Sequence, residues 1–279
     1  MEKVVRTVYG ANLQTCLFHG LPLVIKPHTT LNERLNINAN VLPNSSDVLA
    51  ARYFCIGNKG HGMTIGADNV PLITSVQHRP RDAGLYNQLP FVMRLPANDL
   101  TAAERVNYRL RRAETHGGKT YIAYYGKAID YTNTIPQMDY VKVVSGVSST
   151  TSFEPKASDL TPTPPDISST GVVTTTGDYV TATAKVPFTM SAQEVAELIN
   201  VSNIIYGDSA HAIISEIAIC SGIDKTVMGD FNGVQATYVD AIGVQIAAFI
   251  GAFYSMPFNT NGVSVLLNSG ATEPLLIDS

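Results

Sequence analysis

Val106-Asn107-Tyr108-Arg109-Leu110-Arg111 alternates apolar and polar side chains, and Thr120-Tyr121-Ile122-Ala123-Tyr124-Tyr125 is rich in aromatic and β-branched residues. The alternation predicts a half-buried β-strand, and the composition of the second run predicts another strand. His116-Gly117-Gly118-Lys119 lies between them and carries a glycine pair typical of a tight turn. Together these residues predict a β-hairpin and indicate a β-dominated fold.

Three arginines belong to this region and form the candidate site of the sequence. In a strand, Arg105, Arg109 and Arg111 would point to the same, outer face of the hairpin. Guanidinium groups suit carboxylates and phosphates. Three interpretations stay open: contact with acidic residues of a neighbouring subunit, a solvated sheet face, and contact with nucleic acid. The first, a subunit interface, is the prediction carried forward.

The sequence of the remaining chain predicts mostly strands and one main helix. Ser191-Ala192-Gln193-Glu194 is a capping box followed by apolar residues three and four apart, which predicts a helix over residues 191–202. Residues 48–56 predict a strand, or a short helix running into a strand, and residues 212–220 predict a buried strand. Residues 234–268 predict two or three apolar strands broken at Gly243, Gly251 and a turn over residues 259–262. We therefore expect an α+β, β-dominated fold with an antiparallel sheet or sandwich-like core, one main helix, and long extended arms or loops.

Composition divides the chain into three regions. Residues 1–144 form a basic, strand-rich region with an N-terminal arm, and their first 45 residues have strand and loop character. Residues 145–184 are dominated by Ser, Thr, Pro and Gly and predict an arm or long loop outside the packed core. Residues 185–279 contain the helix and apolar strands, and we expect them to share one core with the first region.

The charge is unevenly distributed. Residues 1–142 contain 16 Lys and Arg against 10 Asp and Glu, a formal +6, whereas residues 143–279 contain 3 against 13, a formal −10. Such asymmetry fits the meeting of a positive surface on one subunit with a negative surface on its neighbour. The 32 residues between Asp240 and Glu273 carry no charge, which fits either a domain core or the centre of an interface.

The sequence predicts no enzyme, cofactor site or metal site. The glycines at 60, 62 and 66 miss the dinucleotide-binding spacing, and the histidines lack metal-binding spacing. The chain has three widely spaced cysteines, Cys16, Cys55 and Cys220, a number and spacing that do not indicate a disulfide framework or a zinc site. We expect them to be small buried side chains in a reducing compartment. We also expect no membrane span, because the most apolar run is too short, and no sequence-specific contact with nucleic acid.

Several runs resemble virion structural proteins of tailed bacteriophages. The resemblance covers about residues 50–225 and includes Arg52-Tyr53-Phe54-Cys55-Ile56-Gly57-Asn58-Lys59-Gly60-His61 and Leu89-Pro90-Phe91-Val92-Met93-Arg94. Pro187-Phe188-Thr189-Met190-Ser191 and the run from Ile214 to Asp224 are similar too. No catalytic or ligand-binding motif accompanies these runs.

The resemblance implies a building block of the neck, collar or baseplate of a contractile-tailed phage. Its partners would be copies of itself in a ring and other virion proteins, and its place would be the virion, assembled in the host cytoplasm. The low charge and proline-bounded segments agree with such a subunit. The alternative is a phage-associated β-rich enzyme or carbohydrate-binding module.

Overall fold

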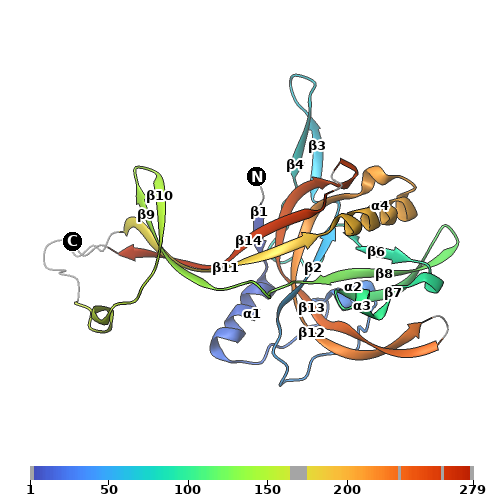
Figure 1. Ribbon diagram of the computed structural model, residues 1–279, viewed down its shortest axis with the longest axis horizontal. Helices are drawn as coiled ribbons and strands as arrows, with labels where there is room; N and C mark the ends of the chain where they lie inside the picture. The colour runs from blue at the N-terminus through green and yellow to red at the C-terminus, as the bar shows by residue number, and fades with distance from the viewer. Residues whose placement is uncertain (1–2, 164–174, 232–233, 259–260, 277–279) are drawn as a thin grey trace. The chain divides into compact units, whose positions relative to one another are not determined.

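The computed structural model describes residues 3–163, 175–231, 234–258 and 261–276 (Figure 1). The fold is α+β and β-dominated, with antiparallel sheets and few helices. The chain forms two compact units. Unit 1 contains residues 1–129 and 189–263, and unit 2 contains residues 130–188 and 264–279.

Unit 1 is built on an eight-stranded sheet in the order β1-β13-β12-β2-β8-β6, with β5 beside β2 and β7 beside β8. Its strands are β1 (Lys3–Arg6), β2 (Ala50–Gly57), β5 (Gln88–Leu89), β6 (Val92–Arg94), β7 (Tyr108–His116), β8 (Lys119–Ala128), β12 (Ile213–Phe231) and β13 (Val234–Ser255). A separate two-stranded sheet contains β3 (His61–Ile65) and β4 (Pro71–Ser75). The helices of unit 1 are α1 (Val8–His19), α2 (Leu31–Leu35), α3 (Ala102–Arg105) and α4 (Ala192–Tyr206), with 3-10 turns η1 (Pro96–Asn98), η3 (Ser209–His211) and η4 (Met256–Phe258).

Unit 2 contains a four-stranded sheet in the order β10-β9-β11-β14. Its strands are β9 (Gln137–Val144), β10 (Val147–Ser152), β11 (Thr175–Met190) and β14 (Val263–Leu276), and η2 (Ala157–Leu160) is a 3-10 turn. Residues 147–152 and 175–184, expected as part of an arm or loop, are therefore strands. Their Ser and Thr side chains do not prevent pairing, because the ladder is made by the backbone. The prolines at 164 and 165 lie outside the described residues.

The predicted hairpin and the predicted helix are both present. Strands β7 and β8 pair through the turn at Gly117 and Gly118, whose positive φ angles of 55° and 75° suit a tight hairpin turn. Helix α4 begins after the Ser191 N-cap, whose side chain accepts from the Glu194 amide as the capping box predicts. It ends at Tyr206, four residues beyond the expected end.

The first 45 residues differ from the expected strand and loop character. They contain the twelve-residue helix α1, capped by Thr7, and the short helix α2, capped by Thr30. Strand β13 also differs, because it runs without a break through Gly243 and Gly251. It pairs with β12 from Val234 to Ser255, and the ladder has three register shifts, one of them at Gly243. Within the described residues, no helix is long and apolar enough to span a membrane.

The uncharged stretch after Asp240 supplies much of the core of unit 1. Residues 241–246 of β13 are buried without alternation, so both faces of the sheet are covered there. Ile242, Val244 and Ile246 are each 0% exposed. This part of the stretch is therefore core, and it leaves no apolar surface free for another chain.

The buried carboxylate of Glu216 in β12 anchors the connections around β3 and β4. It accepts the backbone amides of Lys59 at 3.0 Å, Tyr86 at 2.8 Å and Asn87 at 3.1 Å. The Nε2 atom of His78 lies 2.7 Å from its Oε2 atom. Three separate chain segments therefore meet at one side chain that has no exposure to solvent.

Helix α1 lies directly on β13 at Gly10. A Cβ atom at this position would lie 2.1 Å from the backbone oxygen of Ala247, a distance that real Cβ atoms do not adopt. The Thr7 hydroxyl donates to the Ile246 carbonyl at 2.5 Å and also accepts from the Gly10 amide. The absence of a side chain at residue 10 thus permits this helix–sheet contact.

We expect Gly10→Ala to lower the free energy of unfolding, although alanine is favoured over glycine in a helix by about 1 kcal/mol. The new methyl group would force α1 away from β13, at a cost of about 1–3 kcal/mol for overpacking. Urea denaturation measures the change. Gly62→Ala is the matched control, because a Cβ there meets no atom closer than 3.7 Å; equal effects of both changes would contradict the close contact.

Candidate functional site

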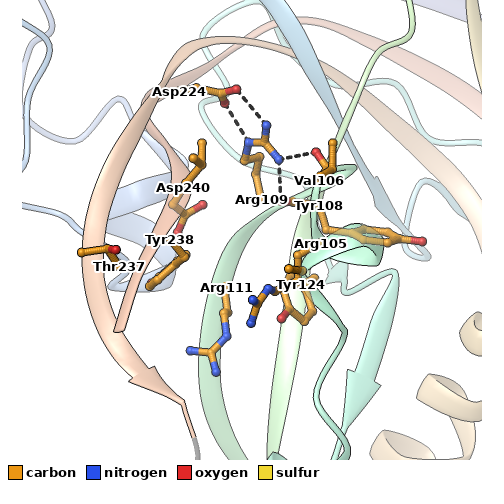
Figure 2. Close-up of a pocket in the computed structure, with 12 residues that line it drawn as sticks. Arg105, Val106, Tyr108, Arg109, Arg111, Tyr124, Asp224, Thr237, Tyr238 and Asp240 are labelled. Atoms are coloured by element: carbon orange, nitrogen blue, oxygen red, sulfur yellow. Dashed lines mark hydrogen bonds and ion pairs between the residues drawn. The ribbon is translucent and has the colours of Figure 1, made fainter. Parts of the chain in front are cut away.

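The three predicted arginines line one pocket of unit 1 (Figure 2). Arg105 is the last residue of α3, while Arg109 and Arg111 lie in β7. The cavity has a volume of about 350 Å³. Its other walls come from tyrosines and from the β12–β13 hairpin, and these residues are Tyr108, Tyr124, Asp224, Thr237, Tyr238, Val239 and Asp240, with Ala102 and Val106 beside α3.

Arg109 forms a two-pronged ion pair with Asp224 of β12. Its Nε atom lies 2.7 Å from Oδ1 and its Nη2 atom lies 2.8 Å from Oδ2. The remaining nitrogen, Nη1, donates to the carbonyls of Val106 and Tyr108. Tyr53 donates to the same carboxylate at 2.6 Å. Burial raises the pKa of Asp224, but hydrogen bonds from Arg109 and Tyr53 outweigh burial and hold that pKa below its usual value.

Arg111 pairs with Asp99 on the other side of the pocket. Its Nη2 atom lies 2.9 Å from Asp99 Oδ2, and the two side chains are only 7% and 8% exposed. The Tyr124 hydroxyl donates to Asp99 Oδ1 at 2.7 Å. The guanidinium carbon lies 5.6 Å from the ring centre of Tyr238, close enough for a cation–π contact. Arg111 is thus enclosed by one acid and an aromatic wall.

The expectation of an exposed arginine face on the β7–β8 hairpin is wrong. Arg109 and Arg111 are each 8% exposed, and Arg105 is half-buried at the end of a helix. Alternation does direct Arg109 and Arg111 into one pocket, but the acids they meet belong to the same chain. Long side chains with paired charges can be buried in this way. That the three arginines belong to a subunit interface stays a prediction. The exposed arginine face that motivated it is absent, since Arg109 and Arg111 are buried.

Charged residues of the basic first half also form ion pairs with acids of the second half of the same chain. Three ion pairs join a basic residue of the first half to an acid of the second half: Arg109–Asp224, Lys127–Glu194 and Arg94–Glu197. Part of the +6 and the −10 is therefore neutralised inside unit 1. The asymmetry does not by itself require a second subunit.

Asp240 joins two strands that are not neighbours in the sheet. Its Oδ1 atom accepts the backbone amide of Leu110 in β7 at 2.6 Å and that of Ala241 in β13 at 2.8 Å. Asn38 donates to Oδ2 at 3.2 Å. Leu110 adopts a φ of 56°, a left-handed conformation that is strained for a leucine. This conformation turns the Leu110 amide toward the carboxylate on β13.

The carboxylate of Asp240 is fully buried, and burial raises its pKa to about 6. The backbone hydrogen bonds from Leu110, Ala241 and Arg111 oppose the rise, because they favour the charged form. An aspartate that titrates near neutral pH is thus placed at the back of the pocket. The sequence offered one signal for it: Asp240 is the last charge before the long uncharged stretch.

The pocket has a structural role in its present arrangement. Its charged groups Arg109, Asp224 and Asp240 are engaged in hydrogen bonds of the same chain. Burial, and then hydrogen bonds to carboxylates, raises the pKa values of Tyr108 and Tyr124, so their hydroxyls stay protonated. Among the residues that the structure describes, no group of three or more His, Cys, Asp or Glu side chains could hold a metal ion.

A comparison with protein families gives one match, to a family of unknown function designated DUF7208, over residues 1–279. The chain belongs to the DUF7208 family. No curated protein and no solved structure is detectably similar to it. The family assignment therefore covers the whole sequence without naming an activity.

We expect Arg111→Gln to lower the free energy of unfolding by about 3 kcal/mol, because it leaves the carboxylate of Asp99 buried without its cation. Urea denaturation at neutral pH measures the loss. Arg105→Gln is the control, since a half-exposed arginine contributes about 0–1 kcal/mol. A loss of the same size for both variants would contradict the unequal environments of the two arginines.

We expect Asp240→Asn to remove a pH dependence of stability. The pKa of Asp240 is about 6 in the folded chain and about 3.9 in an unfolded one. The folded state therefore binds more protons between these values, and the contribution of Asp240 to the free energy of unfolding rises as the pH falls from 7 to 4. Two pKa units correspond to about 3 kcal/mol.

Denaturation curves at several pH values test this expectation. The stability of Asp240→Asn relative to the unaltered chain should be better at pH 7 than at pH 4 by about 3 kcal/mol. Asp224→Asn is the control with the opposite sign, because the pKa of Asp224 is lowered and its contribution disappears at acid pH. A stability difference for Asp240→Asn that does not change with pH would contradict the raised pKa.

Proposed function

We propose that this chain is a structural subunit of a tailed-bacteriophage particle, in the neck, collar or baseplate. It would act by assembly with copies of itself and with other virion proteins. The resemblance of residues 50–225 to such proteins motivates the proposal. The family assignment is compatible with it and adds no activity.

The observation that carries the proposal is the exposure of large apolar side chains on turns and projecting elements. Phe18 at the end of α1 is 84% exposed, Met63 in β3 is 70%, Leu160 in η2 is 86% and Phe258 in η4 is 92%. Single exposed apolar residues are ordinary, but contiguous apolar surface marks contacts with other molecules. On the β3–β4 hairpin such residues lie together: Met63 and Ile73 are cross-strand partners, and Ile65 and Leu72 are 66% and 50% exposed. The chain also has only 15% charged residues, against roughly 25% in average domains.

The pocket supports assembly over the alternative of an enzyme or carbohydrate-binding module. Arg109 and Arg111 are paired with acids of the same chain, and the hydroxyls of Tyr108 and Tyr124 donate to carboxylates. Such a network stabilises a subunit. A catalytic site would instead direct titratable groups toward a substrate.

The test is the presence of the chain in purified particles of the phage that encodes it. We expect quantitative mass spectrometry to find several copies per particle, and immunogold labelling to place them at the neck, collar or baseplate. A nonsense mutation in the gene should yield incomplete particles. Abundant protein in infected cells that is missing from purified particles would overturn the proposal.

A further inference from the structure

Strand β10 is an edge strand of the sheet in unit 2. It is joined to β9 by a turn at Ser145 and Gly146, whose φ angles of 50° and 80° suit a tight hairpin (Figure 1). In the strand order β10-β9-β11-β14, no strand of the described residues lies on the other side of β10. All of its residues are exposed. One side of β10 is therefore open to a further strand.

The register of the hairpin shows which backbone groups of β10 face outward. The amide of Phe153 donates to the carbonyl of Met138 at 2.9 Å, and this pair keeps the register of β10 with β9. Hydrogen-bonded and non-hydrogen-bonded residues alternate along an antiparallel strand, so positions 147, 149, 151 and 153 bond to β9. The residues between them direct their backbone N–H and C=O groups away from the sheet: Ser148, Thr150 and Ser152.

This edge lacks the features that commonly prevent pairing with another chain. Natural edge strands are protected by charged side chains, prolines or bulges. Residues 147–153 contain no charged residue and no proline, and the register of β10 with β9 has no shift. The edge therefore has the chemistry of a site that accepts one more extended strand.

The order of the side chains along this edge selects a second copy as the partner. Residues 147–153 read Val-Ser-Ser-Thr-Thr-Ser-Phe. In an antiparallel pair centred on Thr150, every hydroxyl residue lies opposite a hydroxyl residue. At both ends Val147, which is 72% exposed, lies opposite Phe153, which is 37% exposed. Hydroxyl pairs and aromatic–β-branched pairs are both favourable between strands, so the segment is complementary to itself.

We propose that β10 of one copy pairs antiparallel with β10 of a second copy about a two-fold axis at Thr150. The outward backbone groups of Thr150 then bond to Thr150 of the second copy, and those of Ser148 bond to Ser152. The two four-stranded sheets become one continuous sheet across the axis. The same surface is used on both sides, so the contact joins copies in pairs. This inference rests on the proposed function and names one self-contact of the assembly.

The contact is small, because residues 147–153 supply it on each side, whereas a standard stable interface uses about 20–30 residues a side. We therefore expect the isolated chain to form a weak, reversible dimer at high protein concentration. In an assembly that holds two copies side by side, the effective concentration of the second strand is high, and the same contact is favoured.

Cross-linking at high protein concentration tests the register. In a Cys16→Ser background, the remaining native thiols, Cys55 and Cys220, are 0% exposed. With copper–phenanthroline as oxidant, we expect a mixture of Ser148→Cys and Ser152→Cys to form disulfide-linked dimers, because these positions face each other between copies. Each variant alone should form few dimers, since its two thiols would lie about 13 Å apart along the strands.

The single variants are the matched controls for the mixture. A mixture that forms no more dimers than the single variants, while circular dichroism shows all of them folded, would overturn the proposal. Dimers that form mainly from one single variant would show a different register or a different partner surface and would overturn it as well.

Sedimentation velocity tests the pairing without cysteine. Thr150→Lys should weaken self-association by about tenfold or more, because like charges meet at the axis. Thr120→Lys, at an exposed position of β8, is the control and should associate like the unaltered chain. A mixture of Thr150→Lys and Thr150→Glu should recover association, since opposite charges then face each other. Equal effects of the two lysine variants, or no recovery in the mixture, would overturn the proposal.

The particle composition test of the proposed function is independent of these measurements. A chain found in virions that fails the cross-linking and charge tests would overturn only the β10 contact. A chain that passes both tests and is missing from purified particles would overturn only the role in the virion.

Discussion

The path of the chain between residues 58 and 87 depends on one buried carboxylate, that of Glu216. A buried carboxyl group is costly unless its oxygens accept hydrogen bonds. Glu216 accepts them from the amides of Lys59, Tyr86 and Asn87, and His78 Nε2 lies 2.7 Å from it, so three separate segments contact this side chain. His78 is held in the same place by stacking between the rings of Tyr86 and Phe249, at centroid distances of 4.0 Å and 3.7 Å. A path that moved these segments away from Glu216 would leave its buried oxygens without these partners. The carboxylate therefore selects one arrangement of loops that have little regular structure of their own.

The same anchor sets the direction in which the β3–β4 hairpin leaves the body. The Gly60 amide donates to the hydroxyl of Ser215, beside Glu216, at 2.9 Å, and the Val76 amide closes the base of the hairpin on the Gly60 carbonyl at 2.8 Å. Gly57 contributes by lacking a side chain, since a Cβ there would lie 2.7 Å from the Glu216 carboxylate. The apolar side chains of the hairpin are thus displayed from a fixed base, which reduces the entropy that a binding partner must overcome.

Local sequence patterns predicted the elements whose signals are local. The glycine pair at 117–118 and the capping box at Ser191 each describe contacts within a few residues, and the structure contains both features. The run 106–111 is a strand only from Tyr108 on, and its burial does not alternate, because the four residues from Tyr108 to Arg111 are all buried. Helix α1 was missed because its residues lack a strong apolar stripe, and only two of them, Gly10 and Leu13, are buried. What holds α1 is a close approach to Ala247, far away in the sequence.

The candidate site shows the same division between local and distant information. Alternation predicted that Arg109 and Arg111 share one face of the hairpin, but it placed that face outward, whereas both side chains are buried and line one pocket. Their burial depends on Asp224 and Asp99, and nothing in the spacing of the arginines identifies those partners. The left-handed conformation of Leu110 could not be predicted either, because leucine normally avoids it. The hydrogen bond from its amide to the distant Asp240 stabilises this conformation here. Sequence separations of 115 and 130 residues hide the Arg109–Asp224 and Leu110–Asp240 contacts, whereas Asp99 lies only 12 residues before Arg111 but outside any strand.

The pairing of β1 with β13 has a consequence for the order of events during synthesis. Lys3 lies opposite Gly251, and Arg6 lies opposite Ala248, so the first strand of the chain has no partner until residue 251 has left the ribosome. Closing so long a loop is slow compared with forming the local β7–β8 hairpin. Val5, the buried residue of β1, therefore stays exposed until β13 has been synthesised. During that interval the exposed apolar side chain is available to chaperones.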